Sequence, residues 1–280
     1  HAPGGRARRT PTGRPAARPD TEPAAGPART PRRRRRARGG GRGRGDVLQL
    51  LDRSGDRKGV CLMSIPRDSW VDIPGRGKAK INAAYSWGGP ALTIETMEKL
   101  LEVPMDHTAI IDFEGFMNVI DALGGVTVVN REASSAGGYD FPKGEVTLDG
   151  KKALVFVRQR HGLSDGDFGR ATRQRDVIQA VLTKLASAGT LTDPGKFRDA
   201  VTTLGSNFTV DSGLTNDVII DLGWQMRDFR PSAMHSFQLP TAGFDMTGDG
   251  QSIVVIDSDK IVALREALRS DTMEEFVASL

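Results

Sequence analysis

The sequence predicts a single α/β layered domain over residues 46–280. Short apolar segments typical of strands alternate with longer segments of helical periodicity, and this alternation favours separate layers of sheet and helix. The range holds roughly 235 residues, which is enough to bury one sizeable core. The sequence contains no internal repeat and no apolar run approaching the roughly 20 residues of a membrane helix.

The first part of this range begins with two expected strands. Apolar runs at 47–51 and 59–65 predict strands joined by a polar turn at 53–56. A Gly- and Lys-rich stretch up to Lys80 predicts a loop, and Pro90 suits the first turn of a helix. The apolar stripe of that helix consists of Leu92, Ile94, Met97, Leu100 and Leu101.

The alternation continues toward the C-terminus. We expect a strand at 108–111, a helix at 113–123 ended by Gly124-Gly125, and a strand at 126–129. A long helix is expected from Asp167 to about Ala186. The remaining expected elements are helices at 194–204, 216–226 and 259–268 and strands at 234–239 and 252–256.

Residues 1–45 differ from the rest in composition. They contain 14 Arg, no Lys and two acidic residues, a net charge of +12, and no Val, Ile, Leu, Met or aromatic residue. With nothing apolar to bury they cannot offset the entropy of folding, so we expect a disordered tail. Residues 46–280 carry 25 basic and 33 acidic side chains, a net charge of −8. The basic character of the chain therefore belongs to the tail and does not indicate a nucleic-acid-binding fold.

Cysteine and histidine offer no metal centre in the sequence. Cys61 is the only cysteine, which excludes an intrachain disulfide and a zinc site built from cysteines, and its apolar neighbours predict a small buried side chain. The four histidines are scattered without the spacing of metal ligands.

Basic side chains gather in the segment RQRHGLSDGDFGRATRQR at 158–175. Arg158 and Arg160 precede a glycine-containing loop, and the helix that follows opens with Asp167, Arg170, Arg173 and Gln174. Spacings of three and four predict that these four side chains project from one helix face. A helix N-terminus favours anions, and Arg binds phosphate oxygens bidentately. The segment indicates an anion site suited to pyrophosphate, with an ordinary charged surface as the alternative.

Two other charged segments adjoin predicted strands. Arg67 follows the apolar strand at 59–65, and Arg44 and Asp46 stand at the mouth of the first strand. Ligand loops gather at strand ends in α/β sheets. The Asp46 carboxylate suits a Mg²⁺ ion held against phosphate oxygens. For each position alone, a solvated charge in a loop is the alternative.

Several ordered segments together resemble the LytR-CpsA-Psr family: SIPRDSW (64–70), KINAAYSWGGP (80–90), IDFEGFMNVIDALGGV (111–126), LDGKKALVFVRQRHG (148–162) and DFGRATRQRDVI (167–178). The C-terminal stretch, with LTNDVIIDL (214–222) and GDGQSIVVID (248–257), is similar to actinobacterial members. The resemblance runs from residue 46 to residue 280. It implies the fold of that family, a central mixed sheet flanked by helices.

The resemblance also implies a function. Members of the family are membrane-anchored, extracytoplasmic phosphotransferases of bacterial cell-wall assembly. They move a glycopolymer from a polyprenyl-pyrophosphate carrier to peptidoglycan through a phosphodiester bond. The implied partners are therefore the lipid-linked glycopolymer, the peptidoglycan acceptor and the membrane surface, with no specific nucleic acid. The implied location is the extracytoplasmic face of the cell membrane.

Position by position, the resemblance implies a pyrophosphate site made of Arg67, Arg158, Arg160, Arg170 and Gln174. Arg173 belongs to the same RxxRQ pattern, and Arg44 stands two residues before Asp46, which matches a metal-associated aspartate. Asp167 matches an acid that supports the site. The implied cofactor is Mg²⁺, or Mn²⁺. Phosphoryl transfer needs an electropositive cradle and a metal rather than a covalent nucleophile, so Arg67, Arg158, Arg160, Asp167 and Arg170 form the expected catalytic set.

The chain departs from the family pattern at its front. Family members carry a membrane helix and then a strand of the form GSDxR, and residues 1–43 hold only the Arg-, Pro-, Gly- and Ala-rich tract. We interpret this tract as an out-of-frame translation of GC-rich DNA or a misassigned start, which predicts an N-terminally truncated family domain. Two other functions remain open for such a chain. One is a catalytically impaired polyprenyl-pyrophosphate-binding protein, and the other is a nucleic-acid-binding regulator or transcriptional attenuator.

Two further motifs are expected to be coincidental. The GLSDG segment at 162–166 fits the GxSxG pattern of hydrolases, but it does not closely follow an apolar strand, so Ser164 is not expected to be a nucleophile. The DMTGDG segment at 245–250 resembles the start of an EF-hand loop, but Ile256 occupies the twelfth position instead of Glu. A turn between strands is expected there.

Overall fold

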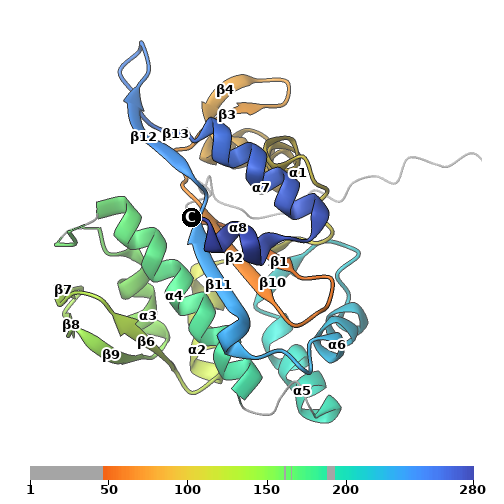
Figure 1. The fold of residues 1–280 in the computed structure, drawn as a ribbon. Coiled ribbons are helices and arrows are strands. Elements are labelled where there is room, and N and C mark those ends of the chain that lie inside the picture. Colours follow the sequence, from red (N-terminus) through yellow and green to blue (C-terminus); the bar gives the residue numbers. More distant parts are fainter. Residues whose placement is uncertain (1–46, 161, 165, 188–192) are drawn as a thin grey trace, which may run out of the picture. The chain divides into compact units, whose positions relative to one another are not determined.

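The computed structural model describes residues 47–280 except 161, 165 and 188–192 (Figure 1). Its central sheet contains β1 (Leu48–Arg53), β2 (Val60–Ile65) and β11 (Met234–Gln238), in the order β1-β2-β11. β1 and β2 form an antiparallel hairpin, whereas β11 lies parallel to β2. The expected mixed sheet is therefore present, with β2 in its centre.

Helices cover both faces of β2, whose six residues are all buried. Successive side chains of a strand point to opposite faces. Cys61, Met63 and Ile65 join a core cluster with α1 (Asn82–Leu101), α7 (Ser258–Ser270) and α8 (Met273–Ala278). Val60 and Ser64 instead contact α4 (Gly166–Ser187), through Leu182 and Ala186 and through Arg175. The result is a helix–sheet–helix arrangement of the kind that the sequence predicts.

A second core cluster lies on the other side of α4. It involves α2 (Phe113–Ala122), β6 (Val126–Asn130), β7 (Ser134–Ala136), β8 (Tyr139–Phe141), β9 (Gly144–Leu148) and α3 (Gly150–Arg158). β6 pairs with β9 and β7 with β8, in both cases antiparallel. The rings of Phe141 and Phe156 meet edge to face with centroids 5.3 Å apart, and Val177 of α4 is fully buried in the same cluster. α4 thus packs against the sheet through Leu182 and Ala186 and against this second cluster through Val177.

The remaining elements surround these cores. They are β3 (Trp70–Ile73), β4 (Gly77–Lys80), β5 (Ala109–Ile111), α5 (Pro194–Gly205), β10 (Phe208–Val210), α6 (Asn216–Gln225), the 3₁₀ turn η1 (Pro231–Ala233), β12 (Thr241–Met246) and β13 (Ser252–Ile256). β3 pairs with β4, β5 with β10 and β12 with β13, each antiparallel. The hairpin of β12 and β13 projects from the sheet in Figure 1.

Most predicted elements are confirmed to within a few residues, but one expectation is wrong. The stretch expected to be a loop up to Lys80 is the β3–β4 hairpin, in which Val71 and Ile73 are buried. Two glycines with positive φ, Gly75 and Gly77, make its turn, so the glycines mark a turn rather than a continuous loop. The helix expected from Pro90 is confirmed: α1 as a whole begins at Asn82, but it is interrupted at Gly89, where φ is 64° and ψ is −155°, and Pro90 stands in the first turn of the part that follows.

A glycine fixes the junction between α2 and β6. Gly125 has a φ of 83°, and a Cβ atom at this position would lie 2.9 Å from the carbonyl oxygen of Leu148. Only glycine adopts this backbone conformation freely, and the close approach of β9 leaves no space for a side chain. The predicted end of the helix at Gly124-Gly125 is confirmed, with Leu123 as its cap.

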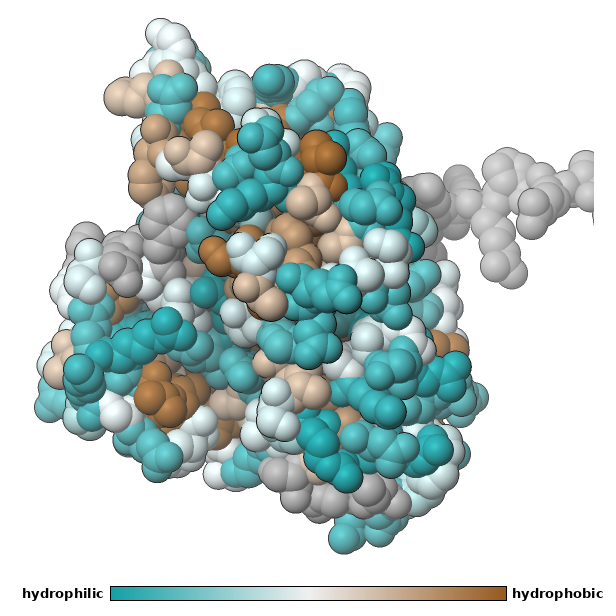
Figure 2. Space-filling model, in the orientation of Figure 1, coloured by the Kyte–Doolittle hydropathy of each residue, from teal (hydrophilic) through white to brown (hydrophobic). Residues whose placement is uncertain are grey.

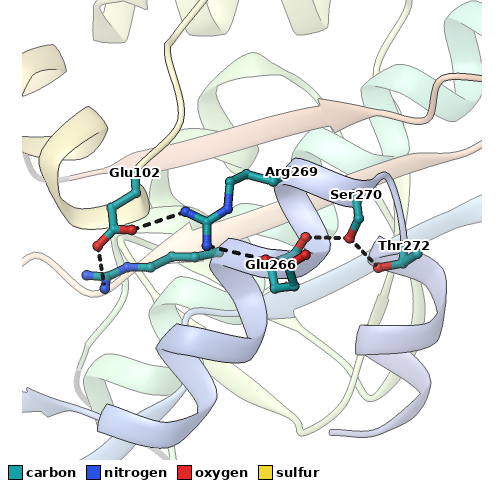
Figure 3. A network of polar contacts seen from close by, with 6 residues as sticks. Glu102, Glu266, Arg269, Ser270 and Thr272 are labelled. Carbon is teal, nitrogen blue, oxygen red and sulfur yellow. Dashed lines mark hydrogen bonds and ion pairs between the residues drawn. The ribbon is translucent and has the colours of Figure 1, made fainter.

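Ion pairs attach α7 to the end of α1 (Figure 3). Glu102 accepts from Arg265 at 2.7 Å and from Arg269 at 3.1 Å, and Arg269 also reaches Glu266 at 3.4 Å. Arg265 donates in addition to the carbonyl oxygen of Leu100 at 3.0 Å. Each exposed pair contributes about 0.2–1 kcal/mol, so this network secures the orientation of α7 more than it stabilises the domain.

The face seen in Figure 2 is mainly hydrophilic, and its hydrophobic residues form small separate patches. One of these patches lies at the base of the β12–β13 hairpin. No helix within the described residues is long and apolar enough to cross a membrane.

Candidate functional site

A pocket of about 60 Å³ opens where β2 ends. Its polar wall includes Gln49, Arg67, Asp68, Arg170 and Gln174, and its apolar wall consists of Leu48, Ile65, Phe244, Ile253 and Val254. A water molecule needs about 10–15 Å³ of such volume, so the pocket admits a small polar group rather than a whole substrate. The structure therefore brings Arg67, Arg170 and Gln174 of the predicted site together, between charged and apolar walls.

Arg67 owes its position to a turn after β2. The backbone N–H of Ser69 donates to the carbonyl oxygen of Pro66 at 3.0 Å, and the N–H of Asn82 donates to that of Arg67 at 3.2 Å. The carboxylate of Asp68 lies 3.5 Å from Nε of Arg67 and 3.4 Å from Nζ of Lys80. Two cations thus share the Asp68 carboxylate at the rim of the pocket.

The first turns of α4 supply the opposite side of the polar wall. Arg170 is 6% exposed and Gln174 is 9% exposed, and a spacing of four residues places both on one face of the helix. Nε2 of Gln174 donates to the carbonyl oxygen of Val157 at 3.3 Å. Because Val157 directly precedes Arg158, this bond connects the pocket wall to the end of α3.

Arg173 does not share that face, so the prediction of a common face for the four residues is wrong for it. Its guanidinium donates to Gln159 at 2.7 Å, to Asn130 at 3.1 Å and to Ser134 at 2.9 Å. It also lies over the ring of Phe156, 4.2 Å from the centroid. One residue along a helix turns the side chain by about 100°, which directs Arg173 into the second core while Gln174 faces the pocket.

Arg158 and Arg160 lie at the C-terminal end of α3 and do not line the pocket. Both are exposed, and the guanidinium of Arg158 lies over the ring of Phe113, 4.7 Å from its centroid. Among the described residues, the bond between Gln174 and Val157 connects this end of α3 to the pocket wall. Three other predicted positions lie outside what the structure describes: Arg44, Asp46 and the side chain of Asp167.

The structure adds two residues that the sequence analysis missed. Arg175 is 8% exposed, and its guanidinium donates to the hydroxyl oxygens of Ser64 and Thr172. Burial lowers the pKa of Arg175, as it does that of Arg173. The amide of Gln49 lines the pocket, and within the described residues neither its nitrogen nor its oxygen has a hydrogen-bond partner. A buried polar group without a partner is rare in proteins and is what a ligand or an ordered water would satisfy.

The described residues do not by themselves form a metal site. Residues 47–280, apart from the undescribed positions, hold no group of three or more His, Cys, Asp or Glu side chains suited to a metal ion. Asp68 is the carboxylate in the pocket wall, and it already pairs with Arg67 and Lys80. The fit of Mg²⁺ therefore depends on Asp46, which lies outside the described part of the chain.

The structure supports the interpretation of the coincidental motifs. Ser164 follows helix α3 and not a strand, and its N–H donates to Glu132 at 3.0 Å, an arrangement unlike a nucleophile elbow. Residues 247–251 form the turn between β12 and β13, closed by a 2.8 Å bond from Gly250 to Thr247. Cys61 is buried as predicted, and desolvation raises the pKa of its thiol to about 11.

Comparison with known proteins places these features in a family. The model of the LytR_cpsA_psr family matches residues 31–270. A relative from Halalkalibacterium halodurans, named polyisoprenyl-teichoic acid–peptidoglycan teichoic acid transferase TagU, is 36% identical over 235 residues, which cover 81% of this chain and 73% of that protein. The protein of the same name from Oceanobacillus iheyensis is 44% identical over 174 residues, which cover 60% of this chain. The chain spans only 53% of the length of this second relative.

The fold gives the same result. The crystal structure of B. subtilis TagV matches with a TM-score of 0.72 and 27% sequence identity, over 81% of this chain and 89% of that chain. The match of the family model covers most of the described residues, including the pocket wall and both arginine segments. The chain belongs to the LytR_cpsA_psr family.

Proposed function

We propose that this protein is a phosphotransferase that moves a glycopolymer from a polyprenyl-pyrophosphate carrier to peptidoglycan. The observation that carries the proposal is the pocket at the end of β2, where Arg67, Arg170 and Gln174 face a wall of apolar side chains. The charged wall suits a phosphate of an anionic head group, and the apolar wall suits the first part of an isoprenoid chain that continues outside the pocket. The names of the relatives, which are teichoic acid transferases acting from a polyisoprenyl carrier to peptidoglycan, support the same reaction class.

The arrangement is suited to phosphoryl transfer. An acceptor hydroxyl attacks the phosphorus next to the glycan, the P–O–P bond breaks, and polyprenyl phosphate leaves while the hydroxyl proton passes to solvent. Charge then develops on the phosphate oxygens, where the guanidinium forks of Arg67 and Arg170 stabilise it from fixed positions. The amide of Gln174 adds a neutral donor, and Arg158 and Arg160 extend the positive surface beyond the pocket.

The proposal includes Mg²⁺, or Mn²⁺, at Asp46, as the family resemblance implies. If bound, such a cation would be held by the Asp46 carboxylate and would supply positive charge to offset the negative charge of the phosphates. Asp167 is proposed to support this side of the site, and Arg44 to add charge beside it. The proposal also places the protein at the extracytoplasmic face of the membrane, where the carrier and peptidoglycan meet.

The proposal is tested with the purified protein, a lipid-linked glycopolymer, peptidoglycan and Mg²⁺. The expected result is release of polyprenyl phosphate together with glycan attached to peptidoglycan. Arg67→Ala and Arg158→Ala should lose this activity, whereas Arg131→Ala, whose side chain is 74% exposed and pairs with Asp176, should keep it. Binding of the carrier without release of lipid phosphate would instead identify a protein that only sequesters it. Salt-sensitive DNA binding that disappears when residues 1–45 are deleted would be nonspecific electrostatics of the tail.

A further inference from the structure

Arg173 is enclosed by protein groups and not by the pocket. The side chain is 5% exposed, and its three hydrogen-bond acceptors come from three different elements or their ends: Asn130 of β6, Ser134 of β7 and Gln159 after α3. The ring of Phe156 covers one face of the guanidinium at 4.2 Å. A planar group with five fixed N–H donors suits such a set of acceptors, which a lysine could not satisfy in the same way.

The acceptors around Arg173 are all neutral. Desolvation lowers its pKa, and the more distant carboxylates of Glu132 and Asp176 only partly oppose that shift. A cation buried among neutral oxygens is expensive to place, so its hydrogen bonds must be well formed to be tolerated. This geometry makes the guanidinium a rigid connector between α4 and the segment after α3.

The connection ends on Gln159, the residue between Arg158 and Arg160. Gln159 is 7% exposed, and its Oε1 accepts from Arg173 at 2.7 Å and from Ser134 at 3.2 Å. Its backbone is extended, with φ −61° and ψ 133°. Neighbouring side chains of an extended segment point to opposite sides. With Gln159 held inward, Arg158 and Arg160 are both presented outward, where both are exposed.

We propose that Arg173 is a positioning residue, which holds Gln159 inward and thereby presents Arg158 and Arg160 to the pyrophosphate head group. It does not contact the substrate itself. This inference rests on the proposed function, since it concerns the same pyrophosphate site. It replaces the direct role in phosphate binding that the RxxRQ pattern suggested for Arg173.

The test is a double-mutant cycle read out as affinity for farnesyl pyrophosphate, a soluble isoprenyl pyrophosphate. Arg173→Met is made in the natural chain and in an Arg158→Ala/Arg160→Ala background, with Arg131→Ala as the exposed control. A positioning role predicts that Arg173→Met weakens binding about tenfold in the natural chain, since misplaced charged groups lose much of their effect. In the background without the two arginines, the same substitution should change the affinity by less than about twofold.

The midpoint of thermal unfolding separates this role from general damage to the fold. Arg173→Met should lower it by a similar amount in both backgrounds, whereas the effect on affinity should appear in only one. Arg173→Lys should not restore affinity, because a lysine lacks the planar fork whose two separate nitrogens donate to Gln159 and to Asn130. An equal loss of affinity in both backgrounds, or restored binding in Arg173→Lys, would mean that Arg173 binds the phosphate directly and would overturn the inference.

A ligand-free measurement distinguishes failure of this inference from failure of the proposed function. Trypsin cleaves after arginine, so its rates of cleavage after Arg158 and Arg160 report how firmly this segment is held. Arg173→Met should raise both rates severalfold relative to Arg131→Ala, whether or not the natural chain binds farnesyl pyrophosphate. Unchanged cleavage rates would overturn the positioning role. Absence of binding by the natural chain would count against the proposed function alone.

Discussion

Arg170 and Arg173 are one turn apart on the same helix, yet their surroundings differ completely. Arg170 lines the pocket at the end of β2, opposite apolar side chains of β1, β12 and β13. Arg173 lies among neutral acceptors of the second core and stacks on Phe156. The two arginines share residue type and lie one helical turn apart, so neither property determines what each guanidinium contacts. The elements that pack on each side of α4 determine those contacts.

The largest expected effect comes from removing the aromatic support of Arg173. Phe156 is fully buried, packs against Phe141 and covers the guanidinium of Arg173. Phe156→Ala leaves a cavity and should lower the free energy of unfolding by about 3–5 kcal/mol. Denaturation by urea measures this change, with Trp224→Ala, an exposed aromatic outside both regions, as the control. A loss below about 1 kcal/mol would show that the second core does not enclose Arg173 as tightly as described.

On the pocket side, the expected effect falls on activity and not on stability. Arg170→Ala should reduce the rate of glycopolymer transfer by about 30- to 1000-fold, which corresponds to about 2–4 kcal/mol of lost transition-state stabilisation. The midpoint of thermal unfolding should stay within a few degrees of the natural protein, in contrast to Phe156→Ala. If Arg170→Ala lowered both the transfer rate and the free energy of unfolding, Arg170 would have a structural role like that of Arg173. The distinction between the two arginines would then be wrong.

Gln174 lies between the two regions, because it lines the pocket and also bonds to Val157. Gln174→Ala removes one neutral donor and should slow transfer by about fivefold to tenfold, equivalent to roughly 1 kcal/mol. Gln174→Glu keeps the shape but brings a negative charge toward the substrate phosphates, so we expect a larger loss of activity. Equal activities of the two variants would indicate that Gln174 acts through Val157 and not through the pocket.

Asp211 lies far from both arginines in the sequence and outside the pocket wall, so it provides a control for the effect of a single polar side chain on stability. Its carboxylate accepts from the N–H groups of Thr108 at 2.7 Å, Gly213 at 2.8 Å and Leu214 at 3.0 Å, and these bonds lower its pKa to about 2. A lowered pKa means that the stabilisation is complete above the ordinary value near 4 and is lost as the pH falls toward 2. Asp211→Ala should therefore cost about 1 kcal/mol at pH 6 and almost nothing near pH 2. A cost independent of pH, measured by urea denaturation, would contradict this account.

Much of the fold can be predicted from local sequence pattern, and the elements that were not predicted have identifiable physical causes. The long apolar periods of α4 and α7 and the apolar run of β2 predict those elements almost to the residue. The β3–β4 hairpin is missed because its strands have only four residues each and its buried side chains, Val71 and Ile73, alternate with polar ones beside glycines. Short strands depend on tertiary contacts that no local pattern shows.

The residues of the candidate site also fall into those that local sequence pattern predicts and those that it does not. Arg67, Arg170 and Gln174 were predicted and do line one pocket, because a strand end and a helix face are both visible in sequence. Arg173 fails because a period of three and four residues describes a face about 100° wide, and the helix has different neighbours at its two edges. Arg175 was missed since its hydroxyl partner Ser64 stands 111 positions away, a separation that no spacing rule covers. The roles assigned to the arginines remain predictions for the variants above to test.

The parallel pairing of β2 with β11 has a consequence for how the protein folds. Val60 of β2 pairs with Met234 of β11. Because most of the chain lies between these two residues, the central sheet forms only after that intervening chain has folded back to bring β11 beside β2. Contacts between distant parts of a sequence form slowly, because the entropy lost in closing the intervening loop is not offset until the strands meet. β1 and β2 can pair early as a local hairpin, but the pocket also needs Gln238 of β11 and residues of β12 and β13. We therefore expect the pocket at the end of β2 to be completed among the last steps of folding, with the apolar side chains of β2 exposed until then.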